Sequence, residues 1–527
     1  MHARTWQNSG EMMLLQRLEM YDPLTGTTTR GDLELEAGQI IRQGQHLSTG
    51  KNIDDRFAGK FLLPAFFDAH THFRLGGEML EQLDCSDINS AEELLQELDR
   101  RCELMTAGSW IEGFGLDLAR INPDLSVVNK VTASHYLFIQ THDLHSALVN
   151  QPALEKGCIT AATPDPPDGR ATRDEQGNPT GIISESLVWL LRQQVPSPGS
   201  AEGYRAIARA TALAHSLGIT AVSENATLED AQLYRELDEL GELQLQLDIW
   251  YRGGNFDRTV LTYPRMQSAN INAHAVKCFV DGAFGSRSAA MYEPYLNSVD
   301  SGVLMAGEEQ IREFVQEAVA TGWQVVMHAI GDRAVHIALE ALSAAIKLHG
   351  QGAGRHRLEH LQVVLPNDYD YMRKLEIVPS LQPVHLRHDQ QTFHSYLNSN
   401  QLANCYRWQP LIERELITPF GTDWPVEKLD PLQNLRTAVT RCNPAGDGAF
   451  IPEEAFTLAR ALRGLTWDPA YAAGLERQRG SLKSGMTADL VVLNANPFQL
   501  PLAELDSLEV IATFRRGEQV YEKSDWS

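Results

Sequence analysis

Apolar residues recur in two alternating patterns through the middle of this chain. Short apolar runs alternate with longer segments of helical periodicity, such as Gln310–Ala320 and Arg333–Leu348. We interpret eight of the short runs as strands: Phe61–Phe67, Ile219–Ser223, Leu245–Trp250, Ala275–Val280, Gln324–Met327, Arg357–Glu359, Val378–Gln382 and Thr418–Gly421. Eight strands separated by helices predict an α/β fold, a (β/α)8 TIM barrel.

Both ends of the chain show a different pattern, in which short strands follow one another with turn signals between them. Near the carboxyl end, Asp489–Leu493 reads as a strand, and Val510–Phe514 and Gln519–Tyr521 read as a hairpin. We therefore expect the two termini to meet in a small composite β-sandwich. The predicted domains are the sandwich (1–60 plus 478–527) and the barrel (61–77 plus 201–477).

The connection after the first predicted strand is unusually long. It contains another strand-like run, His135–Gln140, and a loop rich in proline and glycine, Thr163–Pro179. We interpret residues 78–200 as a subdomain inserted over the barrel mouth, where such an insert would shape a substrate pocket.

Composition limits the partners of this chain. Hydrophobic residues make up 43% and charged residues 22%, as in folded soluble proteins, and the net charge is −24. An acidic surface repels nucleic acid and anionic membranes, so we expect neither as a partner. There is no apolar run of about 18 residues to span a membrane. Six cysteines without a CxxC pair indicate reduced thiols in a cytoplasmic protein.

Potential metal ligands follow several of the predicted strands. His70 and His72 lie two residues apart after the first strand, so their rings should point to the same side. Four later strands end in or near further donors: Lys277, His328, His360 and Asp423. Each alone is as readily explained by packing, and Lys277 by an ion pair with Asp281. Together, nitrogen and oxygen donors at one end of a barrel favour a zinc-type site.

The motifs around these residues resemble the amidohydrolase superfamily, within it the YtcJ-like branch that includes N-substituted formamide deformylases. The matching stretches run from residue 62 to residue 498: LLPAFFDAHTHF (62–73), NPTGIISES (178–186), VKCFVDGAFGSRSA (276–289), VVMHAIGDRAV (325–335), RHRLEHLQVV (355–364), SLQPVH (380–385), FGTDWPVE (420–427) and GSLKSGMTADLVVLNANPF (480–498).

The resemblance implies a hydrolase that cleaves an amide-type C–N bond of a small molecule. It assigns six residues to a shell for one or two divalent metals, expected to be zinc: His70, His72, Lys277, His328, His360 and Asp423. In relatives of this type, the paired histidines and the aspartate hold one metal. The other two histidines hold a second, and a lysine carbamylated by carbon dioxide bridges them. Asp423 would also be catalytic, moving a proton from water to the leaving amine.

Two further groups of residues are expected around this shell. Residues that would orient the ligands are Asp68, Asp332 and Glu359, although each is equally well explained by a helix cap or a local hydrogen bond. Residues that would contact substrate are His145, Arg287, Gln382 and His385. Trp110 and Trp424 would form apolar walls of the pocket or pack in the core.

Three alternatives stay open at this point. The same centre would serve a deaminase or a hydrolase of cyclic amides, because the same activated water attacks each substrate. A non-catalytic metal-binding protein could keep the fold, although the complete ligand set disfavours it. The inserted subdomain could instead make an oligomer contact, as in a homodimer.

Overall fold

The structure of the chain is a computed structural model. It describes residues 12–47, 52–121, 123–141, 146–166, 169–196, 199–442, 448–524 and 526. By its internal contacts the chain divides into two compact units, one formed by Met1–Phe73 with Ala210–Ser527 and the other by Arg74–Arg209. Each unit has its own sheets and core.

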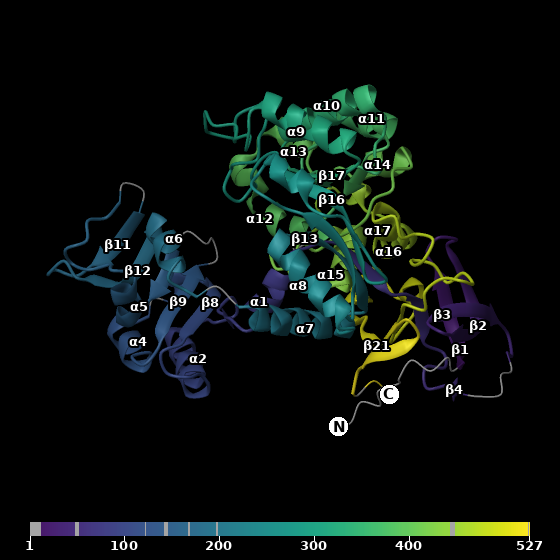
Figure 1. Cartoon of the computed structure of the whole chain (residues 1–527), viewed down its shortest axis with the longest axis horizontal. Helices are drawn as coiled ribbons and strands as arrows, with labels where there is room; N and C mark the ends of the chain where they lie inside the picture. The colour runs from purple at the N-terminus through teal and green to yellow at the C-terminus, as the bar shows by residue number, and fades with distance from the viewer. Residues whose placement is uncertain are drawn as a thin grey trace. The chain divides into compact units, whose positions relative to one another are not determined.

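The larger unit is built around a barrel of parallel strands (Figure 1). Seven strands form its wall in the order β6 (Phe66–Thr71), β13 (Ile219–Ala226), β14 (Gln246–Tyr251), β16 (Ile271–Phe279), β17 (Gln324–Ala329), β18 (Arg357–His360) and β19 (Val378–Ser380). The principal helices of this unit are α8 (Leu228–Glu239), α9 (Glu308–Ala320), α10 (Asp332–His349), α11 (Pro366–Leu375), α12 (Leu386–Tyr396) and α15 (Pro431–Thr440). The predicted α/β barrel is confirmed.

The eighth segment closes the barrel without forming the regular strand expected at Thr418–Gly421. Phe420 bridges Leu381 on one side, and Trp424 bridges Thr71 on the other. The chain turns sharply between these bridges, since Asp423 has a φ of 60°. A left-handed residue interrupts the pleat, so each neighbouring strand receives a single bridge instead of a ladder.

The apolar run Phe61–Phe67, expected to be one barrel strand, divides between two sheets. Its first half is β5 (Phe61–Pro64), which joins the sheet formed by the termini, and its second half begins β6. Pro64 has no N–H to continue a ladder. Beyond it, Ala65 donates to Asp489 O, and Phe66 donates to Gly218 O in the barrel. The chain thus changes sheets at Ala65.

The two termini meet in one mixed sheet, as expected. Its strands run in the order β22 (Glu518–Glu522), β21 (Val510–Arg515), β20 (Leu490–Leu493), β5, β1 (Met13–Asp22), β2 (Thr27–Glu36) and β3 (Gln39–Gly44), with β4 (Ile53–Asp54) paired to β1. Leucine, isoleucine and phenylalanine side chains from both ends share its core, including Leu15, Leu62 and Phe514. β21 and β22 form the predicted hairpin.

The smaller unit has a six-stranded sheet of its own. The strand order is β11 (Gly169–Arg173), β12 (Pro179–Glu185), β10 (Ser146–Val149), β9 (Tyr136–Thr141), β8 (Trp110–Leu116) and β7 (Leu83–Asp84). Helices α2 (Ala91–Leu104), α4 (Leu125–Val131), α5 (Gln151–Lys156) and α6 (Ser186–Arg192) contribute to its two apolar clusters. β9 corresponds to the strand expected at His135–Gln140, shifted by one residue.

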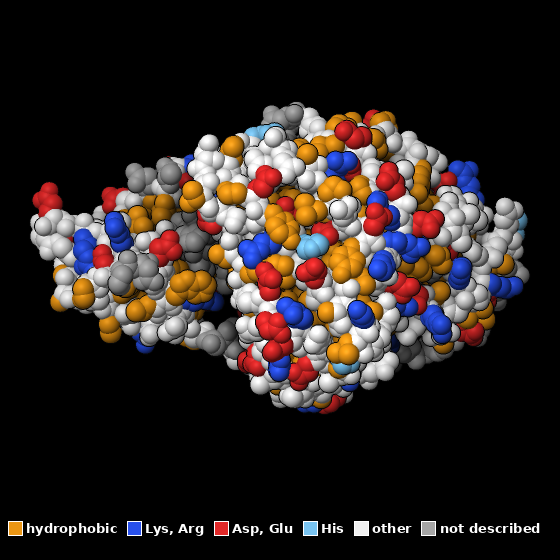
Figure 2. Space-filling view, turned by 90° about the horizontal axis from the view of Figure 1, so that it is seen from above, with side chains coloured by type: hydrophobic (Ala, Val, Ile, Leu, Met, Phe, Trp, Pro, Cys, Tyr) orange, Lys and Arg blue, Asp and Glu red, His pale blue; other side chains and the backbone are white. Residues whose placement is uncertain are grey.

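The surface mixes charges of both signs. On the face shown in Figure 2, acidic and basic side chains are interspersed among apolar ones. Ion pairs between exposed side chains are common in the described part of the chain, as between Arg258 and Glu313. Of the helices in the described part of the chain, none combines the length and apolar character needed to cross a membrane.

Candidate metal centre

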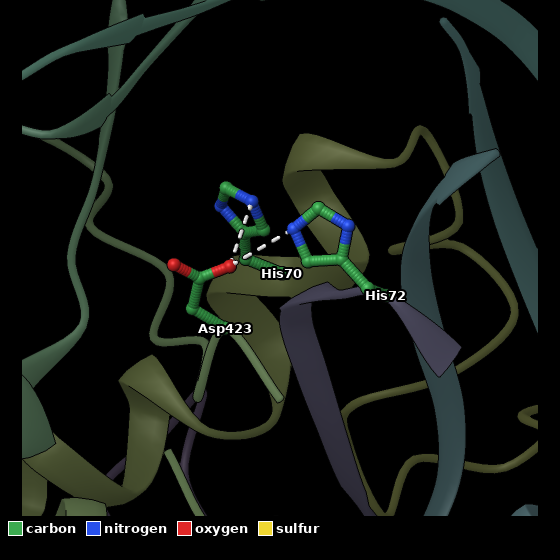
Figure 3. A group of neighbouring side chains, drawn as sticks. All are labelled: His70, His72 and Asp423. Atoms are coloured by element: carbon green, nitrogen blue, oxygen red, sulfur yellow. Dashed lines mark ion pairs between the residues drawn. The ribbon is translucent and has the colours of Figure 1, made fainter. Parts of the chain in front are cut away.

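Two histidines of β6 and its extension face one carboxylate of the closing segment (Figure 3). His70 Nε2 lies 3.5 Å from Asp423 Oδ1, and His72 Nε2 lies 3.3 Å from the same oxygen. Both rings point inward because alternate residues of a strand share a side. Their donor atoms lie close enough together to hold one cation, so the structure brings these three predicted ligands into one group.

A second group shares Asp423 through its other oxygen. His385 Nε2 lies 3.8 Å from Asp423 Oδ2, and the His360 and His385 rings stack with centroids 5.9 Å apart. The three residues also have donor atoms close enough for a cation. His385 was expected to contact substrate, and its position beside Asp423 is compatible with either role.

Lys277 and His328 complete the cluster from β16 and β17. The His328 ring lies 4.4 Å from that of His360 between centroids. Lys277 is 3% exposed, and its Nζ has no hydrogen-bond partner among the described residues. The Nζ lies 5.7 Å from the Trp250 ring and 5.2 Å from that of Phe279. Burial lowers the pKa of this amine to about 8.

A buried salt bridge fixes the orientation of His70. Glu359 Oε2 lies 2.8 Å from His70 Nδ1, and Arg357 Nε donates to Glu359 Oε1 at 2.9 Å. Burial alone would raise the pKa of Glu359, but Arg357 and His70 outweigh it and hold this pKa at about 2. An ionised Glu359 keeps the proton on Nδ1, so the lone pair of Nε2 faces Asp423. Gln382 Nε2 adds a contact of 3.4 Å to the same carboxylate.

Asp281 and the carbonyl of Gly282 lie beside His328. Its carboxylate accepts the N–H groups of Ala290, Ile330 and Gly331, and it lies 3.6 Å from His328 Nε2. His328 Nε2 lies 3.1 Å from Gly282 O, to which it donates. This contact leaves His328 Nδ1 as the atom available to a ligand.

Burial makes the histidines of the cluster good ligands. It lowers the pKa of His70 to about 4 and of His328 to about 3, with the Lys277 charge acting in the same direction. The pKa of His360 also falls well below its usual range, chiefly through burial. Neutral imidazoles carry the lone pair that a metal requires.

Asp68 and the local backbone position Asp423. Asp68 accepts from Thr422 N at 3.0 Å and from Thr422 Oγ1 at 2.7 Å. A Cβ at Gly421 would lie 2.5 Å from the backbone nitrogen of His70, so only glycine allows this close approach. Asp423 and His360 both have positive φ values, 60° and 77°. Such strain is typical of functional sites, where the surrounding contacts maintain it.

The remaining predicted site residues make other contacts. Arg287 is exposed, with its guanidinium 5.8 Å from the Tyr396 ring. Asp332 accepts from Tyr292 N at the start of α10. Trp110 stacks on Tyr136 in the core of the smaller unit, and Trp424 packs edge-on against Phe73. His145 falls outside the described residues.

The contacts of three residues near the centre were not expected from the sequence. Trp250 meets the His70 ring edge-on at 5.3 Å, Arg357 holds Glu359, and Asp281 holds the loops beside His328. A sequence signal existed for two of them. Arg357 is a charge inside a predicted buried strand, and Asp281 directly follows one. Trp250 had no such signal, because in the sequence it is an ordinary apolar residue of a predicted strand.

The sequence profile of the amidohydrolase family matches residues 58–521, which is most of the chain. The chain belongs to the amidohydrolase family. Family membership agrees with the resemblance noted in the motifs and with a barrel carrying a sheet from both termini.

Individual relatives are similar over nearly their whole length. The Bacillus subtilis (strain 168) protein YtcJ is 28% identical over 499 residues, covering 88% of this chain and 90% of its own. An N-substituted formamide deformylase of Arthrobacter pascens is 26% identical over 490 residues, covering 89% of each chain. A metal-dependent hydrolase of Pyrococcus horikoshii OT3, known from its crystal structure, has a TM-score of 0.78 at 25% identity, covering 94% of this chain and 99% of that one.

Proposed function

We propose that this amidohydrolase-family protein is a metal-dependent hydrolase that cleaves an amide-type C–N bond of a small molecule. The observation that carries the proposal is the convergence of His70 and His72 on Asp423 at 3.3–3.5 Å, at the carboxyl end of the barrel strands. Active sites of barrel enzymes lie at this end. The formamide deformylase among the relatives supports the bond type, since its name gives an N-substituted formamide as its substrate.

The donor set suits a divalent metal of the zinc type. Neutral imidazoles and a carboxylate are ligands that zinc accepts. His360 Nδ1 and Lys277 Nζ are buried and have no hydrogen-bond partner among the described residues, as expected of atoms reserved for a ligand. The proposed holders of the metal are His70, His72, Lys277, His328, His360 and Asp423. When bound, such a metal supplies Lewis-acid chemistry that acidifies water and polarises carbonyl oxygens.

Lys277 is proposed to be carbamylated. Its lowered pKa leaves part of the amine neutral near pH 8. A neutral Nζ can attack the carbon of carbon dioxide, forming an N–C bond and releasing one proton. The product carboxylate would replace an unpaired buried ammonium by an anionic ligand, which agrees with the unpartnered position of Nζ.

Asp423 is the proposed proton carrier. Burial alone would raise its pKa, but the facing imidazoles of His70, His72 and His360 outweigh it, and the pKa lies well below its usual range. The carboxylate is therefore ionised, and it would take up a proton from the attacking water and deliver it to the leaving nitrogen. Asp68 and Thr422 hold the segment that carries it.

Metal content per chain is the measurement that tests this proposal first. The protein would be purified without chelator and with bicarbonate, and its metals determined by elemental mass spectrometry. A value near two supports a binuclear centre with carbamylated Lys277, and a value near one supports a single metal. His72→Ala should lower the value, while His349→Ala, an exposed histidine at the end of α10, should not. A wild-type value near zero that zinc or manganese does not raise would contradict the proposal.

The substrate class follows from a panel of compounds. Formamides, N-acyl amino acids, lactams and aminated heterocycles would be offered to the metal-loaded protein. Hydrolysis of the open-chain amides is the expected result. Turnover of lactams or heterocycles alone would instead identify a cyclic-amide hydrolase or a deaminase on the same centre.

A further inference from the structure

Asn225 lies on the inner wall of the barrel, close to the carboxyl end of β13. In the parallel pairing with β14, Asn225 is opposite Trp250 and Ser223 is opposite Asp248. Ser223 Oγ donates to Asp248 Oδ2 at 2.8 Å, and Trp250 Nε1 donates to the same oxygen at 2.9 Å. Residues two apart on a strand share a side. Asn225 therefore faces the interior, one layer nearer the mouth than Ser223.

The neighbouring residue Trp250 places this position beside the candidate metal centre. The Trp250 ring meets the His70 ring at 5.3 Å and lies 5.7 Å from Lys277 Nζ. On the other side, β13 pairs with β6, where Glu224 is opposite Thr71, between the two paired histidines. Asn225 thus lies on the wall between His72 and Trp250.

The carboxamide of Asn225 is buried, and the described part of the chain offers it no hydrogen bond. Asn225 is 2% exposed, and neither Nδ2 nor Oδ1 has a hydrogen-bond partner among the described residues. Unpaired buried polar groups are unfavourable and uncommon. By contrast, Asn150, equally buried in the smaller unit, donates to Thr132 O and His135 O and accepts from Leu137 N. An unpaired amide at a barrel mouth indicates bonds that a ligand completes.

We infer that Asn225 is a specificity-determining residue that hydrogen-bonds the substrate, accepting from an amide N–H through Oδ1 and donating to a substrate oxygen through Nδ2. The inference rests on the proposed amide-hydrolase function and narrows its substrate class. An amide that keeps an N–H, such as an N-monosubstituted formamide, provides both groups, and they lie side by side when the amide is in its cis conformation. A tertiary amide lacks the donor and would leave Oδ1 unpaired. A site of this kind discriminates against the analogue that lacks the bond.

The test compares formanilide with N-methylformanilide, which differ by this N–H. The ratio of their kcat/KM values would be measured for wild type, Asn225→Leu and Asn225→Asp. Leucine removes both hydrogen-bonding groups and keeps the branched shape of the side chain, and aspartate keeps an acceptor. The matched control is Asn272→Leu, near the start of β16 at the opposite end of the barrel, where Nδ2 donates to Ala473 O at 2.8 Å.

In wild type and in Asn272→Leu, formanilide should be preferred, and Asn225→Leu should lower that preference by roughly tenfold or more. Asn225→Asp should retain more of the preference, because its oxygen still accepts from the N–H. The aspartate variant also tests the inference if the leucine variant does not fold. An unchanged preference in a folded Asn225 variant would overturn the inference.

Failure of the proposed function gives a different result. If the metal-loaded wild type hydrolyses neither compound, the amide-hydrolase proposal fails, and the same pair is used as ligands in calorimetric titrations. Tighter binding of formanilide than of N-methylformanilide, lost in Asn225→Leu, would still support the role of Asn225. Equal binding of both compounds to wild type would overturn it.

Discussion

The two ends of the barrel differ in the pairing of particular buried polar side chains. At the amino end, Arg479 is 6% exposed and pairs with Asp489, which also accepts from Arg516 N at 2.8 Å. At the carboxyl end, Lys277 is 3% exposed with an unpartnered Nζ, and the amide of Asn225 is unpartnered within the described chain.

The difference indicates that the amino end of the barrel mainly contributes stability and the carboxyl end mainly contributes chemistry. Charges at the amino end join the barrel to the terminal sheet: Arg479 also donates to Gln246 Oε1 at 3.0 Å, at the start of β14. At the carboxyl end, some polar groups orient one another, as in the chain Arg357–Glu359–His70. Lys277 Nζ and the Asn225 amide have no partner among the described residues. Substitutions at the first end should therefore affect folding, and those at the second should affect activity.

Asp423→Asn should have the largest effect on activity. Loss of the proton carrier is expected to lower kcat by about 10²–10⁴-fold. The unfolding temperature of the metal-free protein should change little, because the asparagine side chain is isosteric. Amide hydrolysis and metal content would be measured on the same preparation. Full turnover with metal bound would show that Asp423 does not carry the proton.

Asp489→Leu should have the largest effect on stability. It leaves Arg479 as a buried charge without its partner, which is expected to destabilise the fold by about 3–5 kcal/mol. Activity per folded molecule should remain near that of wild type. Chemical denaturation gives the free energy of unfolding. Replacing both residues, as in Arg479→Met with Asp489→Leu, should recover much of the loss, and no recovery would argue against the ion pair as the cause.

Removal of the proposed metal should lower stability by a smaller amount. A ligand at about 100 times its Kd stabilises the folded state by about 2.7 kcal/mol. A chelator should therefore lower the unfolding temperature of wild type and leave that of His70→Ala nearly unchanged. An equal shift in both proteins would point to an effect of the chelator elsewhere.

Lys277→Met should give the smallest change in stability, and in the opposite direction. It replaces a buried amine, which has no hydrogen-bond partner in the described ranges, by an apolar side chain of similar length. In metal-free protein we expect a gain of about 0.5–2 kcal/mol, accompanied by loss of metal and activity. Differential scanning calorimetry of both metal-free proteins would measure it. A marked destabilisation would show that Lys277 has a structural partner.

How far the sequence could predict the site is clear from particular residues. The spacing of His70 and His72 places two imidazoles on one side of a strand whatever surrounds them. The gathering of the donors after later strands can also be predicted, since the carboxyl ends of parallel strands meet at one edge of a barrel. The tautomer of His70 does not follow, because Glu359, which sets it, is 289 residues away along the chain.

The sequence by itself determined the fold class and the residue types that gather at the barrel mouth, because strand periodicity and strand ends are local properties. Only the tertiary structure decided the change of sheets at Ala65, the single bridges of the closing segment and the unpaired amide of Asn225. Each of these depends on whether a distant residue supplies a hydrogen bond, and no local pattern contains that information.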